Sequence, residues 1–116
     1  MLALFVYGTL RPNEINHHYL QPLSGKWLNA SIQGTLYEHG LGPTTGYKVV
    51  DLSQPKQSIS GMILFSDELA QAWPELDEFE GEGYVRELTT AIDNAGNEHQ
   101  VFVYALDKKY FHLRPQ

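Results

Sequence analysis

The sequence Leu2-Ala3-Leu4-Phe5-Val6-Tyr7-Gly8-Thr9-Leu10 indicates the architecture more clearly than any other part of the chain. Residues 2–7 are apolar, contain aromatic and β-branched side chains, and run into a glycine, which is typical of a buried strand. A glycine after such a strand allows the backbone to approach a ligand or to adopt a positive φ. Successive amide N–H groups in a turn of this kind can hold a carboxylate or stabilise an oxyanion.

The turn at Gly8 leaves two interpretations open at this point. It either contacts a ligand or simply reverses the chain, as most strand–glycine turns do. It is not a Walker loop, because the Gly-Lys-Thr/Ser sequence is missing. It is not a dinucleotide-binding turn either, because Gly-x-Gly-x-x-Gly is absent.

Five further strands are predicted from apolar runs that are bounded by glycine, proline and polar residues. They are Trp27 to Tyr37, Tyr47 to Leu52, Ile59 to Phe65, Tyr84 to Ile92 and Gln100 to Leu106. The turn Asp93-Asn94-Ala95-Gly96-Asn97 joins the last two as a hairpin. A short helix is predicted from Pro12 to Leu20, with Ile15 and Tyr19 on one face, and another begins at Ser66 as its N-cap.

This inventory predicts an α+β fold. About six strands and two short helices in so small a chain suggest a strongly curved or closed sheet. The 116 residues suffice for one domain and are too few for two ordinary ones, so residues 1–116 are expected to form a single domain. The order of the strands does not follow from the pattern.

The composition excludes several classes of protein. With 14 acidic and 8 basic residues the chain carries a formal charge of −6, which argues against nucleic acid as a partner. The absence of cysteine excludes disulfides, thiolate zinc sites and a cysteine nucleophile. The apolar start from Met1 to Val6 has no basic leader and is too short to cross a membrane, so no membrane partner and a cytoplasmic location are expected.

The segment from Leu69 to Gly81 contains a carboxylate in an unexpected position. Leu69, Ala72, Trp73 and Leu76 follow the spacing of a buried helical stripe, although Pro74 is expected to kink or divide the helix. Glu80 lies four residues after Leu76 and therefore on the buried face, whereas its acidic neighbours Glu75, Asp77 and Glu78 point away from it.

Two interpretations of Glu80 remain open from the pattern alone. It either ends the helix and turns out to solvent, or it occupies a partly apolar pocket. In a pocket, desolvation would raise its pKa and suit it to exchange protons near neutral pH. The adjacent His17 and His18 would diverge by about 100° in a helix, so no metal site is predicted from them.

Two segments together resemble a known family. Phe5-Val6-Tyr7-Gly8-Thr9-Leu10-Arg11 is similar to the N-terminal Tyr-Gly-Thr/Ser-Leu signature of gamma-glutamylcyclotransferase-like proteins. Leu76-Asp77-Glu78-Phe79-Glu80-Gly81, followed by Tyr84-Val85-Arg86, resembles the Leu-Asp-x-x-Glu-Gly…Tyr-x-Arg segment of the same family. A weaker match is the strand Val101-Phe102-Val103-Tyr104, so the resemblance extends over nearly the whole chain.

The resemblance implies a small mixed β-barrel of about six strands with short flanking helices. It implies that Glu80 is the catalytic glutamate and that Tyr7, Gly8, Thr9 and Leu10 form a loop that cradles the substrate. Tyr84 and Tyr104 fall at positions near the cavity, although from the pattern alone each could equally belong to the core. The implied substrate is a small γ-glutamyl molecule, and no metal or organic cofactor is implied.

The implied reaction is the closure of a γ-glutamyl amide or amine to 5-oxoproline with release of the amine, by an enzyme of the acyltransferase or lyase type. Two alternatives stay open. One is a binding module that uses the same cavity for an amino-acid-like metabolite without catalysis, and the other is a hydrolase acting on a γ-glutamylated intermediate. Burial of Glu80 in a cavity lined by Tyr7 and Leu10 favours an enzyme, and exposure of Glu80 away from Gly8 argues against a shared site.

Overall fold

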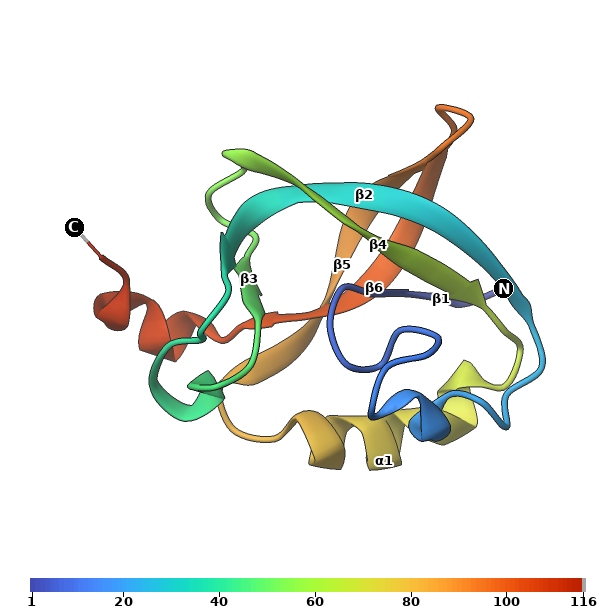
Figure 1. The fold of residues 1–116 in the computed structure, drawn as a ribbon, viewed down its shortest axis with the longest axis horizontal. Coiled ribbons are helices and arrows are strands. Elements are labelled where there is room, and N and C mark those ends of the chain that lie inside the picture. The colour runs from blue at the N-terminus through green and yellow to red at the C-terminus, as the bar shows by residue number, and fades with distance from the viewer. Residues whose placement is uncertain (116) are drawn as a thin grey trace.

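The computed structural model describes residues 1–115, in which five strands close into a barrel and a sixth extends it at one edge (Figure 1). The barrel order is β2-β4-β1-β6-β5, and β5 pairs back onto β2 to close the ring. Only the β1–β6 pair is parallel. The strands are β1 (Ala3–Val6), β2 (Lys26–Tyr37), β3 (Val49–Asp51), β4 (Gln57–Phe65), β5 (Tyr84–Asp93) and β6 (Glu98–Leu106). The predicted α+β barrel is thereby confirmed.

Strand β1 is buried on both faces, because successive side chains of a strand point to opposite sides. Ala3, Phe5 and Tyr7 pack with residues of every other strand inside the barrel. Leu4 and Val6 pack outside it, against the helix α1 (Leu69–Glu80) and the loop that follows β1. A strand covered on both sides has no polar alternation, which explains the continuous apolar run at the start of the sequence.

Helix α1 covers the outside of the barrel as predicted, but it is continuous. Leu69 and Leu76 are buried and Ala72 and Trp73 pack beside them, so the predicted stripe is confirmed. Of the two outcomes expected at Pro74, a kink or a division, the division is wrong, since residues 69–80 form one helix around it. The predicted N-cap is also displaced, because the Ser66 hydroxyl accepts the Glu68 N–H at 3.1 Å and caps the turn before α1.

The predicted helix from Pro12 to Leu20 is wrong. Of this segment only His17–Tyr19 forms a short 3₁₀ helix, and the rest is a series of turns. Asn13 has a φ of 70°, which no helical residue adopts, and local hydrogen bonds replace the helical ladder. Ile15 is 81% exposed while Tyr19 stacks on Phe79 at 4.3 Å between ring centres, so these two side chains share no face.

Different structures lie at the two ends of the β5–β6 pair. At one end the predicted β5–β6 hairpin is confirmed, with Asp93 Oδ1 accepting the N–H groups of Ala95 and Asn97. At the other end in Figure 1 a 3₁₀ helix, Lys108–Leu113, leads to Arg114, whose guanidinium lies 3.0 Å from the buried Asp51 carboxylate. Along residues 1–115 no helix is long and apolar enough to span a bilayer.

Candidate active site

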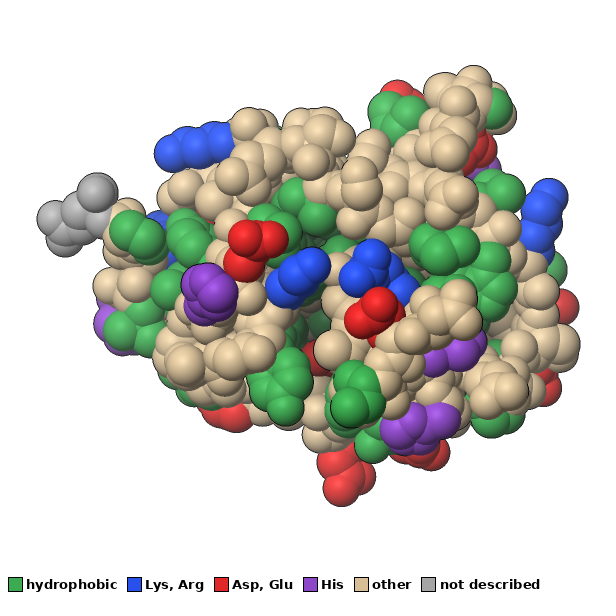
Figure 2. All heavy atoms as spheres, viewed as in Figure 1, with side chains coloured by type: hydrophobic (Ala, Val, Ile, Leu, Met, Phe, Trp, Pro, Cys, Tyr) green, Lys and Arg blue, Asp and Glu red, His purple; other side chains and the backbone are tan. Residues whose placement is uncertain are grey.

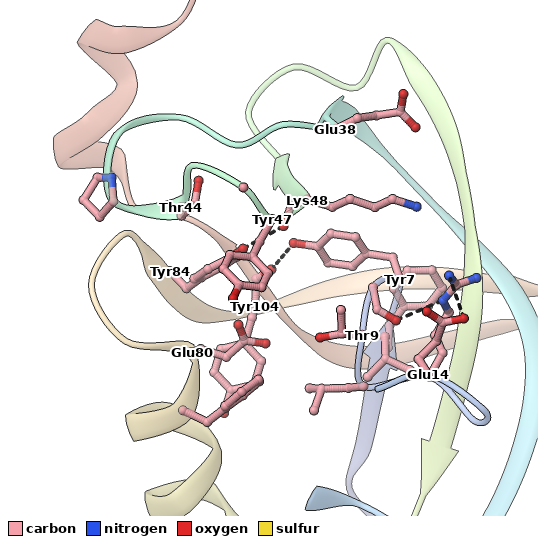
Figure 3. Close-up of a pocket in the computed structure, with 18 residues that line it drawn as sticks. Tyr7, Thr9, Glu14, Glu38, Thr44, Tyr47, Lys48, Glu80, Tyr84 and Tyr104 are labelled. Carbon is pink, nitrogen blue, oxygen red and sulfur yellow. Dashed lines mark hydrogen bonds and ion pairs between the residues drawn. The ribbon is translucent and has the colours of Figure 1, made fainter. Parts of the chain in front are cut away.

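A cavity of about 400 Å³ lies at the end of the barrel where β1 stops and β3 and β5 begin. This volume falls in the range of small-molecule sites. The cavity opens as a hollow in the surface (Figure 2). The structure brings every predicted site residue to the wall of this cavity (Figure 3). These residues are Tyr7, Gly8, Thr9, Leu10, Glu80, Tyr84 and Tyr104.

Glu80 is the last residue of α1, and the chain leaves the helix at Gly81 with a φ of 70°. The Glu80 side chain is partly buried and points into the cavity (Figure 3). Within the described part of the chain its carboxylate makes no ion pair and accepts no hydrogen bond. Desolvation raises its pKa to about 7, so Glu80 can both take up and release a proton near neutral pH.

Three tyrosines form the wall beside Glu80, and each hydroxyl donates to a partner within the protein. The Tyr7 hydroxyl donates to the Tyr104 carbonyl at 2.6 Å and accepts the Val50 N–H at 3.2 Å. Tyr84 donates to the Lys48 carbonyl at 2.7 Å, and Tyr104 donates to Asp77 Oδ1 at 2.6 Å. Burial is the main cause that raises all three pKa values, so these phenols stay protonated and shape the wall.

Asp77 is exposed, as predicted, and its carboxylate also ties α1 to the sheet. Besides accepting from Tyr104, it pairs with Arg86 of β5 at 2.9 Å. The Arg86 guanidinium also lies 4.3 Å from the centre of the Trp73 ring. These contacts hold the last turns of α1 against β5 and β6, and this fixes the direction in which Glu80 leaves the helix.

The turn after β1 presents backbone N–H groups that the protein does not use. No acceptor among residues 1–115 receives a hydrogen bond from the N–H of Gly8, Thr9 or Leu10. Unpaired N–H groups are rare in protein interiors, so a free run beside a cavity indicates groups available to a ligand. Gly8 does not have a positive φ, and an added Cβ would meet no atom within 4 Å. Its missing side chain therefore leaves room in the cavity.

The mouth of the cavity contains charged residues, and of these Glu14, Glu38 and Lys48 were not singled out from the sequence. Lys or Arg side chains and Asp or Glu side chains lie together beside the hollow (Figure 2). They are Arg11, Glu14, Glu38 and Lys48, joined by Tyr47, which is 58% exposed. The only sequence signal for Glu14 is its spacing of three residues from Arg11, which it approaches to 3.9 Å. Among residues 1–115, no three histidine, aspartate or glutamate side chains are arranged to hold a metal ion.

Comparison with known proteins places the chain in a family. Residues 4–115 match the model of the family described as "Gamma-glutamyl cyclotransferase, AIG2-like". The chain belongs to this gamma-glutamyl cyclotransferase, AIG2-like family. A curated relative from Niallia circulans, gamma-L-glutamyl-butirosin B gamma-glutamyl cyclotransferase, is 36% identical over 99 residues, which are 84% of this chain and 60% of the relative.

Solved structures of other proteins share the fold. YkqA from Bacillus subtilis superposes with a TM-score of 0.70 at 28% identity, over 91% of this chain and 36% of that one. An AIG2-like protein from Mus musculus superposes with a TM-score of 0.68 at 24% identity, over 100% of this chain and 86% of that one. This member of the family thus spans only about 60% of the length of its curated relative and about a third of the length of YkqA.

Proposed function

We propose that this protein is a cyclotransferase that closes a γ-glutamyl amide or amine to 5-oxoproline and releases the amine. The observation that carries the proposal is the position of Glu80, a partly buried carboxylate that points into the cavity and has a pKa of about 7. Family membership and the name of the relative from Niallia circulans support a γ-glutamyl substrate.

The first step is the attack of the substrate's α-amine on its own γ-carbonyl. The Glu80 carboxylate accepts a proton from the amine, and the nitrogen forms a bond to the γ-carbon. Attack within one molecule is strongly favoured by proximity, so the protein mainly has to fold the γ-glutamyl chain into the reacting geometry. The negative charge that develops on the γ-oxygen suits the free N–H groups of Thr9 and Leu10.

The second step releases the leaving amine. Protonated Glu80 returns its proton to the leaving nitrogen, the bond between this nitrogen and the γ-carbon breaks, and the oxyanion collapses to the lactam carbonyl. One carboxylate with a pKa near neutrality can serve both steps, since it is neither too acidic to take a proton nor too basic to give one back. The proton taken from the attacking nitrogen is returned to the leaving nitrogen, and one carbon–nitrogen bond replaces another. The reaction therefore balances without a further reactant.

The direct test is 5-oxoproline release from a panel of γ-glutamyl dipeptides and γ-glutamylamines, followed by chromatography against the authentic product. We expect release of 5-oxoproline and free amine in equal amounts from at least one member of the panel. Free glutamate instead of 5-oxoproline would identify a hydrolase. Calorimetric binding of a panel member that is never turned over would identify the alternative, a binding module.

Adding a methyl group at Gly8 tests whether the turn contacts the substrate. The Cβ of Gly8→Ala has no protein atom within 4 Å, and Gly8 has no positive φ, so the urea midpoint should not change. Because Gly8 lines the cavity, the methyl group occupies space that the substrate needs. We expect KM to rise roughly tenfold, equivalent to about 1.4 kcal/mol of binding. Unchanged steady-state kinetics would show that the substrate does not approach this turn.

A further inference from the structure

In the loop after β1 the carbonyls of Gly8 and Thr9 accept hydrogen bonds within the protein, whereas the N–H groups of Thr9 and Leu10 donate none. The Gly8 carbonyl accepts from the Arg11 N–H at 3.2 Å and from Arg11 Nε at 3.0 Å. The Thr9 carbonyl accepts the Asn16 N–H at 3.0 Å. In a trans peptide the N–H of the following residue points opposite to the carbonyl, so the N–H groups of Thr9 and Leu10 point away from these contacts.

Asn16 makes a second contact to the same residue. Its side-chain Nδ2 donates to Thr9 Oγ1 at 2.9 Å. An amide nitrogen can only donate, so Thr9 Oγ1 accepts this bond and keeps its own proton for another partner. Figure 3 shows the Thr9 hydroxyl directed into the cavity on the side of Glu80.

We propose that Asn16 is a positioning residue of this site, which holds the Thr9 hydroxyl as a hydrogen-bond donor toward the substrate. The proposal rests on the function proposed above. With the Thr9 side chain held in this way, its hydroxyl and the N–H groups of Thr9 and Leu10 form one set of donors for a carboxylate or an oxyanion of the γ-glutamyl group.

The segment that carries Asn16 is itself fixed to the barrel. His17 Nδ1 lies 2.9 Å from the Leu10 carbonyl, and a carbonyl can only accept, so this nitrogen carries the proton. The His17 ring also packs on Trp27 of β2 at 5.6 Å between ring centres. Asn16 is not among the residues that line the cavity, so we expect it to act through Thr9 and not by touching the ligand.

Two substitutions of Asn16 distinguish the effect of reversing the hydrogen bond to the Thr9 hydroxyl from the effect of removing it. Asn16→Asp keeps the shape of the side chain, but an ionised carboxylate can only accept, so the Thr9 hydroxyl must turn its proton away from the cavity. Asn16→Ala removes the contact and keeps the main-chain bond to the Thr9 carbonyl. We expect kcat/KM to fall about tenfold in Asn16→Ala and further in Asn16→Asp.

A double-mutant cycle with Thr9→Val distinguishes positioning from a purely structural role. If Asn16 acts through the Thr9 hydroxyl, Asn16→Ala should cost nothing further in kcat/KM once that hydroxyl is gone. Losses that multiply in the double variant would overturn the proposal and leave Asn16 with a structural role, as would equal activity of Asn16→Asp and wild type.

A binding measurement separates this inference from the proposed reaction. The same four proteins of the cycle are titrated calorimetrically with 5-oxoproline, which retains the α-carboxylate of the substrate. If the affinity losses of Asn16→Ala and Thr9→Val are non-additive in the double variant, the positioning role is supported. If, in addition, no panel member is turned over, the proposed cyclotransferase activity is refuted. Turnover of a panel member, with affinity losses that multiply in the double variant, would support the cyclotransferase and refute the positioning role. The absence of both turnover and 5-oxoproline binding would overturn both proposals.

Discussion

Glu80→Gln is expected to lose about 10²–10⁴-fold in kcat for 5-oxoproline release, since an amide of the same shape cannot exchange the proton in either step. The measurement is the single-turnover rate at saturating substrate. Glu78→Gln is the matched control, because Glu78 lies exposed on the same helix and the chemical change is the same. A Glu80→Gln protein with wild-type turnover would remove Glu80 from the mechanism.

The same substitution should stabilise the folded protein above neutral pH. Burial raises the Glu80 pKa from 4.5 to about 7, so between these values the folded state holds a proton that the unfolded chain has released. Stability therefore falls as the pH rises through this window. A shift of this size corresponds to at most about 3 kcal/mol, and to less here because the carboxylate is partly exposed to solvent.

Urea unfolding at several pH values measures this effect. Glu80→Gln and wild type should be equally stable below pH 4.5, where the carboxyl is protonated in both states. Above pH 7 the variant should gain about 1–3 kcal/mol, an amount that Glu78→Gln does not reproduce. A difference that does not change with pH would show that Glu80 titrates normally. A stable but inactive variant would demonstrate that the site is maintained at a cost to the fold.

Gly61→Ala is expected to destabilise the barrel by about 3 kcal/mol through overpacking. Gly61 lies in β4 opposite Ala30 of β2, and an added Cβ would lie 2.3 Å from the Val6 carbonyl and 2.6 Å from Phe5 Cζ. The nearest atom is backbone, so relief requires β1 and β4 to move apart where they pair.

The urea midpoint of Gly61→Ala measures this cost, with Gly8→Ala as its control. Both variants add one methyl group at a residue without a positive φ, but only Gly61 has neighbours in the way. We expect a large shift in the first and none in the second. A Gly61→Ala midpoint equal to wild type would mean that the barrel accommodates the methyl group without strain.

The spacing of apolar residues predicted strand β1 and helix α1, because both depend on residues that are close together in the sequence. The apolar run of β1 reflects burial on both faces, and the position of Glu80 follows from its spacing from Leu76 on one helix. The loop after β1 could not be predicted in this way, because Asn13 has a positive φ and Asn16 bonds back to Thr9. Propensity and spacing describe helices and strands, not turns held by side chains.

The pairing of strands that are far apart in the sequence could not be predicted either. Nothing in the pattern shows that β2 pairs with β5 to close the barrel, or that β1 lies parallel to β6. Lys48 lines the cavity, and its carbonyl accepts a hydrogen bond from the Tyr84 hydroxyl, a contact between residues 36 apart in sequence. Such a residue carries no sign of its position in a single sequence.

The parallel pairing of β1 with β6 has a consequence for how the protein is made. Leu4 is opposite Phe102, and the Tyr7 hydroxyl binds the Tyr104 carbonyl, 97 residues further along the chain. A ribosome adds roughly 5–20 residues per second, so β1 waits for seconds before its last neighbour emerges. Until then its apolar side chains lack the cover that they have in the finished barrel, and they invite wrong pairings. Tyr104 of β6 forms part of the cavity wall and binds Tyr7, so the cavity is incomplete until β6 joins the barrel.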